Sequence, residues 1–188
     1  MEAFATTTDL ATRLNRTFTV DEQMWLTTLL EDASAYLRTE VIGQNVYPPA
    51  TVTFDDWPTA GRVDLPQYPI VRIDAVKRDG VDIDYEYRPG YITVQGDEKI
   101  EITYTYGVVE APDDLIRLTC VLVSSALIPL ENQLGLTAGG LSSVALDDFK
   151  LAWADAGSAS GMVLPPIQSA TVRAMFGRGG FEMVETGR

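Results

Sequence analysis

The stretch 112–130 constrains the fold most strongly, because after its first residues it is dominated by apolar side chains. It opens with a proline, which suits a first helical turn, and two aspartates then place negative charge at the positive end of the helix dipole. The apolar residues cover nearly the whole circumference, which predicts burial on most sides. Pro129 is expected to end the helix. Arg117 and the short length argue against a membrane span, which needs about 20 apolar residues. We therefore predict a core helix over 113–128.

Bulk composition limits the functions that are open to the chain. Its 188 residues suffice for one domain with arms and a substantial core. The formal net charge of −13 gives no general attraction to phosphate backbones or anionic membranes. The single cysteine, Cys120, lies in the predicted core helix, so we expect a buried, unreactive thiol and no disulfide or cysteine zinc cluster. The N-terminus lacks signal-peptide features, which predicts a protein made and kept in a cytoplasm.

Two amphipathic helices are predicted ahead of the core helix. Residues 8–15 form a short capped helix, with Leu10 and Leu14 one turn apart on one face. Residues 21–42 form a longer helix that ends at Gly43. Its apolar stripe follows the i, i+3, i+4, i+7 spacing and consists of Leu26, Leu29, Leu30, Ala33, Leu37 and Val41. The charged residues expected on the opposite, solvent-facing side are Glu31, Asp32, Arg38 and Glu40.

The middle of the chain is predicted to be β structure. Residues 44–68 contain several prolines and predict an extended excursion with few regular turns around two short β-like runs. Alternating runs separated by turn sequences then predict strands at 71–76, 81–85, 91–94 and 99–106. Asp79-Gly80, between the first two runs, is a strong hairpin-turn signal. Together these runs predict an antiparallel meander with one apolar and one polar face, inserted before the core helix.

The chain changes character after the core helix. A glycine- and serine-rich stretch predicts a flexible loop, followed by a strand-like run at 142–146 and a last short helix at 165–177. Many apolar residues persist there, so this arm is expected to fold back or to dock on another chain. The predicted fold class is α+β: a small helical bundle around a buried central helix, with an inserted antiparallel β meander and an extended C-terminal arm. Residues 1–130, with a β insertion at 50–106, would form the body, and 131–188 the loop, the strand-like stretch and the docking arm.

The sequence contains no group of residues that predicts an active site. The absence of histidine removes the commonest general base, histidine-based triads and imidazole metal sites. Carboxylates remain as the route to a metal enzyme, at Asp55-Asp56, Asp113-Asp114 and Asp147-Asp148, with Asp79, Asp82 and Asp84 as a calcium-like set. Each has a plainer explanation as a helix start, a turn or an outward strand position, and no EF-hand spacing occurs. We predict a protein that is not an enzyme and that has no cofactor or metal.

Three tryptophans are available for contacts with other proteins. Aromatic side chains anchor interfaces, and they fill cores equally well. Trp57 lies in the proline-rich excursion and Trp153 beside a flexible joint, so both are assigned to an interface, whereas Trp25 is expected in the core or at its margin.

The order of the predicted elements carries a family resemblance. Its parts are the opening 8–14, the helix segment 29–38 with Gly43-Gln44 after it, the β insertion before Pro112-Asp113-Asp114-Leu115, the core helix and the strand-like run 140–149. This arrangement, over roughly 6–176, resembles the head-to-tail adaptor, or connector, proteins of long-tailed bacteriophages. The likeness lies in order and spacing, and no catalytic signature is involved.

The resemblance implies a structural virion protein at the head–tail junction. Its subunits would form a ring, commonly twelvefold, between the portal and the tail, which extends the DNA channel and provides the tail attachment surface. The implied partners are the portal protein, a tail-side neck protein (stopper or tail terminator) and other copies of the chain. Genomic DNA would pass through without specific binding, since an acidic lumen repels phosphate. No membrane partner is implied.

Two sets of site residues follow as hypotheses. Portal docking is assigned to the C-terminal arm through Met162, Val163, Ile167, Val172, Arg173, Met175, Phe176 and Arg178. Contacts between subunits are assigned to Glu31, Asp32, Tyr36, Arg38, Trp57 and Trp153. The loop 131–140 or the β insertion would face the channel or the tail. The alternatives are another neck protein (a stopper or tail terminator), a carboxylate-dependent metal enzyme, or a cytoplasmic binding module unrelated to phages.

Overall fold

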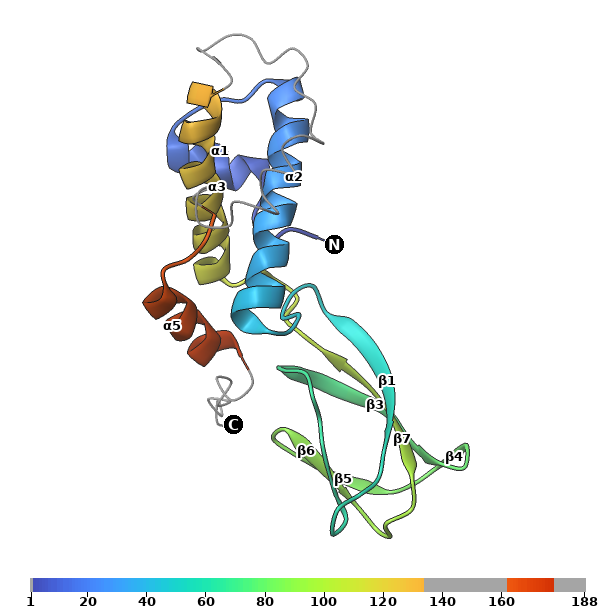
Figure 1. The fold of residues 1–188 in the computed structure, drawn as a ribbon. Helices are drawn as coiled ribbons and strands as arrows, with labels where there is room; N and C mark the ends of the chain where they lie inside the picture. Colours follow the sequence, from blue (N-terminus) through green and yellow to red (C-terminus); the bar gives the residue numbers. More distant parts are fainter. Residues whose placement is uncertain (1, 134–161, 178–188) are drawn as a thin grey trace, which may run out of the picture. The chain divides into compact units, whose positions relative to one another are not determined.

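The structure is a computed structural model that describes residues 2–133 and 162–177 (Figure 1). It is of mixed α+β type with helices and antiparallel sheets, which confirms the predicted class. The chain divides into two compact units, one from Met1–Leu37 with Ala111–Ser169 and one from Arg38–Glu110 with Ala170–Arg188. The β insertion therefore belongs to a unit that has its own hydrophobic core.

Three helices build the described part of the first unit, and each contacts the other two. They are α1 (Thr7–Leu14), α2 (Val20–Tyr36) and α3 (Asp113–Gln133). The predicted helices at 8–15 and 21–42 are confirmed, the second because α2 continues as a π-helical segment, η1 (Leu37–Ile42), and stops at Gly43. The whole predicted apolar stripe of this helix is buried. Burying one leucine fully contributes about 2 kcal/mol, so this stripe is the main reason why the helix forms where it does.

One prediction about the core helix is wrong. α3 continues past Pro129, because a proline inside a helix removes one N–H bond and bends the chain without preventing its neighbours from staying helical. The predicted burial on most sides is confirmed over 113–127, where Asp113, Arg117, Val121 and Ser125 form one exposed line at intervals of four residues. Val121 on this line is 55% exposed despite its apolar side chain.

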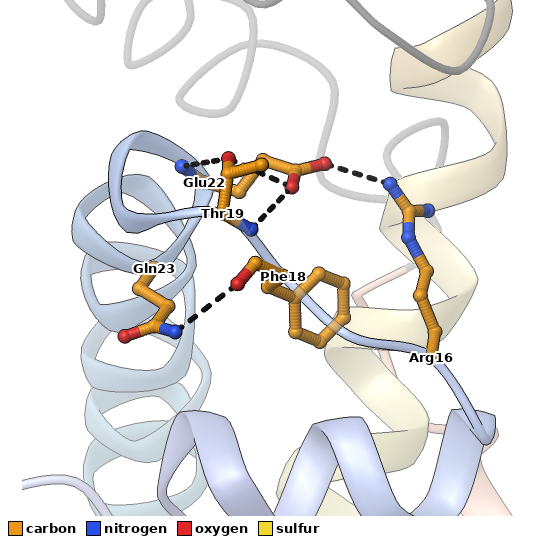
Figure 2. Close-up of polar contacts among 5 residues, drawn as sticks. All are labelled: Arg16, Phe18, Thr19, Glu22 and Gln23. Carbon is orange, nitrogen blue, oxygen red and sulfur yellow. Dashed lines mark hydrogen bonds and ion pairs between the residues drawn. The ribbon is translucent and has the colours of Figure 1, made fainter.

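Capping residues fix the start of α2 (Figure 2). Thr19 Oγ1 accepts a hydrogen bond from Glu22 N at 3.3 Å, and Glu22 Oε2 accepts one from Thr19 N at 2.8 Å. Glu22 Oε1 lies 2.7 Å from Arg16 Nη2, and Gln23 Nε2 donates to Phe18 O at 3.2 Å. α1 begins with the same reciprocal arrangement. These bonds satisfy amides that a helix start leaves without intrahelical partners, so local sequence determines where both helices begin.

In the described residues of the second unit, seven strands form two antiparallel sheets. The first sheet has the order β1 (Ala50–Asp56), β7 (Ile100–Tyr106), β3 (Ile70–Arg78) and β4 (Val81–Asp82). The second has the order β2 (Arg62–Asp64), β6 (Tyr91–Val94) and β5 (Tyr85–Arg88). Strands β2, β3, β6 and β7 contribute to one core of Val63, Leu65, Val76, Ile92, Val94, Ile100, Ile102 and Tyr104.

The predicted meander is wrong in its topology, although the predicted turn at Asp79-Gly80 and most of the strands are present. The hairpin at Asp79-Gly80 joins β3 to β4, and Gly90 turns β5 into β6. The predicted strand 81–85, however, divides into β4 and β5, which belong to different sheets. The two short β-like runs predicted within 44–68 are confirmed as strands β1 and β2. Each sheet buries only one face, so dividing the strands between two sheets lets their apolar faces cover one another.

The last described helix, α5 (Pro166–Phe176), confirms the helix predicted at 165–177. In the second unit its C-terminal half is tied to η1 and the turn after it. Arg173 Nε donates to Val41 O at 2.9 Å and Arg173 Nη2 to Glu40 O at 2.7 Å, and Gln44 Nε2 donates to Phe176 O at 2.8 Å. A cation near carbonyls at a helix end is favourable, so Arg173 stabilises the end of η1.

The cap of α2 predicts a specific dependence of stability on pH. The hydrogen bond from the Thr19 backbone, helped by the Thr19 hydroxyl and by Arg16, holds the pKa of Glu22 below its usual value. A lowered pKa in the folded state stabilises the fold above the unfolded-state pKa, and this contribution disappears as pH falls through the folded-state pKa.

Glu22→Gln keeps the capping geometry without the charge. We expect it to unfold at a lower temperature than the wild type at pH 7 and at nearly the same temperature once the pH is below the folded-state pKa, as measured by thermal melts. Glu31→Gln, on the exposed side of α2, is the matched control and should show no such difference.

Candidate functional site

The predicted carboxylate pairs take part in local contacts in the structure. Asp55 Oδ2 lies 2.7 Å from Lys99 Nζ, and Asp56 Oδ1 accepts a hydrogen bond from Trp57 N at 2.8 Å. Asp113 and Asp114 lie in the first turn of α3. The pair 147–148 is outside the described residues. Within residues 2–133 and 162–177, no three carboxylate or cysteine side chains are grouped as metal ligands would be.

A polar hollow of about 630 Å³ lies on the second unit beside β5. The acidic residues Asp82, Asp84 and Glu86 line it, and Asp82 and Asp84 belong to the set that the sequence suggested for calcium. Its one lining arginine, Arg78, has its Nη1 3.1 Å from Glu98 Oε2 and donates from Nη2 to Gln95 O at 2.5 Å. The hollow is therefore acidic on balance, and it holds no cysteine, serine or lysine that could act as a nucleophile.

Trp57, one of the predicted interface residues, is exposed, with 61% of its surface accessible. It follows directly after β1, and Lys99 Nζ lies 5.4 Å from its ring centroid in a cation–π contact. The same ammonium pairs with Asp55, so a lysine holds both the end of β1 and the indole. Exposed tryptophans of this kind are frequent anchors in protein interfaces. Trp25 is half-buried, as expected for the core margin, and Trp153 lies outside the described residues.

Arg38, which was assigned to a solvent-facing side, is 4% exposed. Its Nε donates to Asn45 Oδ1 at 3.0 Å and its Nη2 to Tyr47 O at 2.9 Å, so its guanidinium holds the chain that leaves η1. The expectation fails because π-helical winding and the turn after Gly43 place acceptors around this position, which helical spacing alone does not reveal. Glu31 is exposed, Asp32 is half-buried, and the Tyr36 hydroxyl accepts from Leu164 N at 3.2 Å.

The residues assigned to portal docking fall into two groups. Met162, Val172 and Phe176 are buried at 2%, 5% and 8% exposure, so they stabilise this chain's own fold. Arg173 is bonded to η1 as described above. The side chains that reach the surface are those of Val163, Ile167 and Met175, at 46%, 82% and 44% exposure. Arg178 lies outside the described residues. The described part of the arm therefore presents a smaller apolar surface than the sequence suggested.

One set of contacts that the sequence reasoning missed lies on the outer face of the first sheet, which is the polar face that alternation predicted. Thr51 and Thr53 of β1 hydrogen-bond through their hydroxyls with Thr105 and Thr103 of β7, at 2.9 and 2.8 Å. Thr105 also donates to Asp74 Oδ2 at 2.7 Å, and this bond, with help from Arg72, lowers the pKa of Asp74. The repeated Thr-x-Thr pattern was the available signal, since alternation places both threonines of each strand on one face.

Cys120 is buried, and burial raises the pKa of its thiol, which agrees with the expected unreactive cysteine. In the described part of the chain no helix is long and apolar enough to cross a membrane. Comparison of the chain with protein-family models and with curated proteins finds no match.

The placement of Arg38 predicts a stability effect that a surface residue would not show. Arg38→Lys keeps the charge but cannot reproduce the separate bonds to Asn45 and Tyr47, which weakens the hold on a partly buried carbonyl. We expect a loss of about 1–3 kcal/mol in unfolding free energy, measured by chemical denaturation. Arg88→Lys, on the exposed strand β5, is the matched control and should change stability by less than about 0.5 kcal/mol. Equal effects of the two substitutions would contradict the buried role of Arg38.

Proposed function

We propose that this chain is a structural virion protein of a long-tailed bacteriophage that forms a ring between the portal and the tail. The ring would extend the DNA channel and provide the surface to which the tail attaches. Its partners would be the portal, a tail-side neck protein and neighbouring copies of the chain, at the head–tail junction.

The observation that carries the proposal is the insertion of a β unit with its own core between α2 and α3. This is the order of elements in which the sequence resembles phage adaptors, and the structure has α1, α2, the β insertion, α3 and α5 in that order. The finer arrangement, a helical bundle with a docking arm, is part of the proposal. A ring subunit needs rigid units that present lateral surfaces, and two separately cored units meet that need.

Charge supports the channel role. The chain carries a formal net charge of −13, so a lumen built from it would repel phosphates and let the genome pass without being held. The repulsion would weaken as salt rises, because the screening length shortens.

The portal-docking surface is narrowed to the exposed side chains of the C-terminal arm, Val163, Ile167 and Met175. The buried members of the original set would contribute only indirectly, by holding α5 in place. A substitution that places a charge on the exposed residues should therefore reduce docking while leaving the fold intact.

The proposal is tested by co-sedimentation of the chain with the portal ring encoded near it, followed by negative-stain imaging. A collar of added density on the tail-facing end of the portal is the expected result. Ile167→Glu and Met175→Glu should each weaken binding about tenfold or more, since each removes an apolar contact and buries a charge. Val109→Glu is the matched control, because Val109 is 79% exposed and lies in the second unit outside the arm. Absence of binding by a folded wild-type chain would contradict the adaptor role.

Another neck protein, a stopper or tail terminator, is the nearest alternative, and the seven strands among the described residues of the second unit are the observation that favours it. Such a protein would bind to the adaptor-bearing portal or to the tail end and not to the bare portal. Imaging of the two assemblies separates these outcomes.

The metal-enzyme alternative makes its own prediction at the acidic hollow. If Asp82, Asp84 and Glu86 held a divalent ion, magnesium or manganese would raise the melting temperature, because a ligand that binds only the folded state stabilises it. We expect no specific shift, and Asp84→Asn should respond to added metal in the same way as the wild type. A saturable rise that Asp84→Asn abolishes would favour the enzyme.

A further inference from the structure

β1 forms an edge of its sheet and is by far the longest edge strand of the β unit. It spans seven residues, whereas the other edge strands β2, β4 and β5 span three, two and four. Soluble proteins normally protect such an edge with a proline, a lysine or a covering segment. β1 has no proline or lysine, and its sequence Ala-Thr-Val-Thr-Phe-Asp-Asp has high β propensity.

The backbone groups that point away from the sheet can be assigned from the hydrogen-bond pattern. Gly107 N donates to Pro69 O at 2.8 Å, so the odd-numbered residues of β7 bond toward β3. Bonding direction alternates along a strand, so the even-numbered residues of β7 bond toward β1. Their partners in the register are Ala50, Val52, Phe54 and Asp56. The N–H and C=O groups of Thr51, Thr53 and Asp55 therefore point outward, and no described residue is bonded to them.

This edge is complementary to itself. If a second copy pairs antiparallel with Thr53 opposite Thr53, all three outward donors and all three outward acceptors of each strand find partners. Thr51 then lies opposite Asp55 of the second copy, so no two carboxylates face each other, and Lys99 already neutralises Asp55. Val52 lies opposite Phe54 of the second copy, which is a favourable pairing of β-branched and aromatic side chains.

The same register accounts for the exposed tryptophan. Counting outward from Thr53 brings Trp57 opposite Pro49 of the second copy, and both residues are exposed in the single chain. Covering the indole with a proline ring removes apolar surface from water at each end of the paired strands.

We propose that the free protein forms a two-fold dimer in which β1 pairs antiparallel with β1 of a second copy, centred on Thr53. The first sheets of the two copies then join into one continuous sheet. A two-fold contact is closed and cannot be the contact that repeats around a ring, so this inference goes beyond the proposed function. It concerns the state of the protein before assembly, in which self-pairing keeps an aggregation-prone edge covered.

The proposal is tested by the oligomeric state of the full chain, measured by sedimentation over about 1 to 100 µM, where small interfaces dissociate. We expect a mass that rises to twice that of the monomer. Thr53→Pro removes the outward N–H at the two-fold axis and keeps every backbone bond to β7, losing only the hydroxyl bond to Thr103. It should therefore give a monomer at every concentration. Tyr87→Pro is the matched control. Tyr87 lies in β5, in the other sheet. A two-residue turn joins Arg88 to Tyr91, so these two residues form a hydrogen-bonded pair. Because the bonding direction alternates along a strand, the N–H of Tyr87 also points outward.

A second variant keeps the test decisive if Thr53→Pro fails to fold. Hydrogen-bonded residues facing each other across an antiparallel pair have Cα atoms about 5.5 Å apart, which suits a disulfide. Thr53→Cys should therefore give a covalent dimer on mild oxidation, whereas Tyr87→Cys should not, and the buried Cys120 should not react.

Three outcomes would overturn the proposal. A wild-type monomer with rapidly exchanging amides at Thr51, Thr53 and Asp55 would show that the edge stays open. A monomer in which these amides are protected would show that another part of the same chain covers it. A dimer that survives Thr53→Pro and gives no Thr53→Cys cross-link would use another surface. Binding to the portal is measured separately, so failure of the dimer and failure of the adaptor role are distinguishable.

Discussion

The pairing of β7 with strands on both of its sides is the constraint on which the second unit depends. β7 lies between β1, which precedes it by some fifty residues, and β3, and it supplies three of the eight core residues, Ile100, Ile102 and Tyr104. Tyr104 is fully buried, contacts Phe54 edge-on, and has its hydroxyl hydrogen-bonded to Gln67. Because β7 fills the centre of its sheet, β1 is left at the edge. The open edge of β1, and with it the exposed position of Trp57 directly after β1, follows from the pairing of β7 with both β1 and β3.

The first unit depends on different physics. Its helices begin where local capping residues set them, at Thr6 and Thr19, and its core is a set of buried leucines at helical spacing. Such contacts are local in sequence along each helix, which is why they can be recognised without a structure. The proline inside α3 is an informative exception. Local chemistry weakens the helix there, yet the backbone on both sides of Pro129 stays helical.

The two proposals use separate parts of the chain. The adaptor proposal depends on the order of the elements and on the exposed side chains of the C-terminal arm. The dimer proposal depends on backbone groups at one sheet edge and would hold for any protein with this β unit. A self-paired edge in the free state is compatible with later assembly, because an interface formed mainly by one strand pair is small and can be exchanged for a larger one.

The sequence alone determined the α+β class, the starts of the helices, the turn at Asp79-Gly80 and the burial of Cys120, because these depend on spacing, capping and turn chemistry within a few residues. Tertiary structure decided the rest. Strand neighbours are non-local, so alternation in 81–85 could not reveal that β4 and β5 enter different sheets. Arg38 had the sequence context of a surface residue, and only the fold of the chain after Gly43 brought carbonyl and amide acceptors around its guanidinium. The open edge of β1 likewise exists only because β7 and not a neighbour in sequence pairs with it, and no pattern within β1 itself records which of its sides is covered.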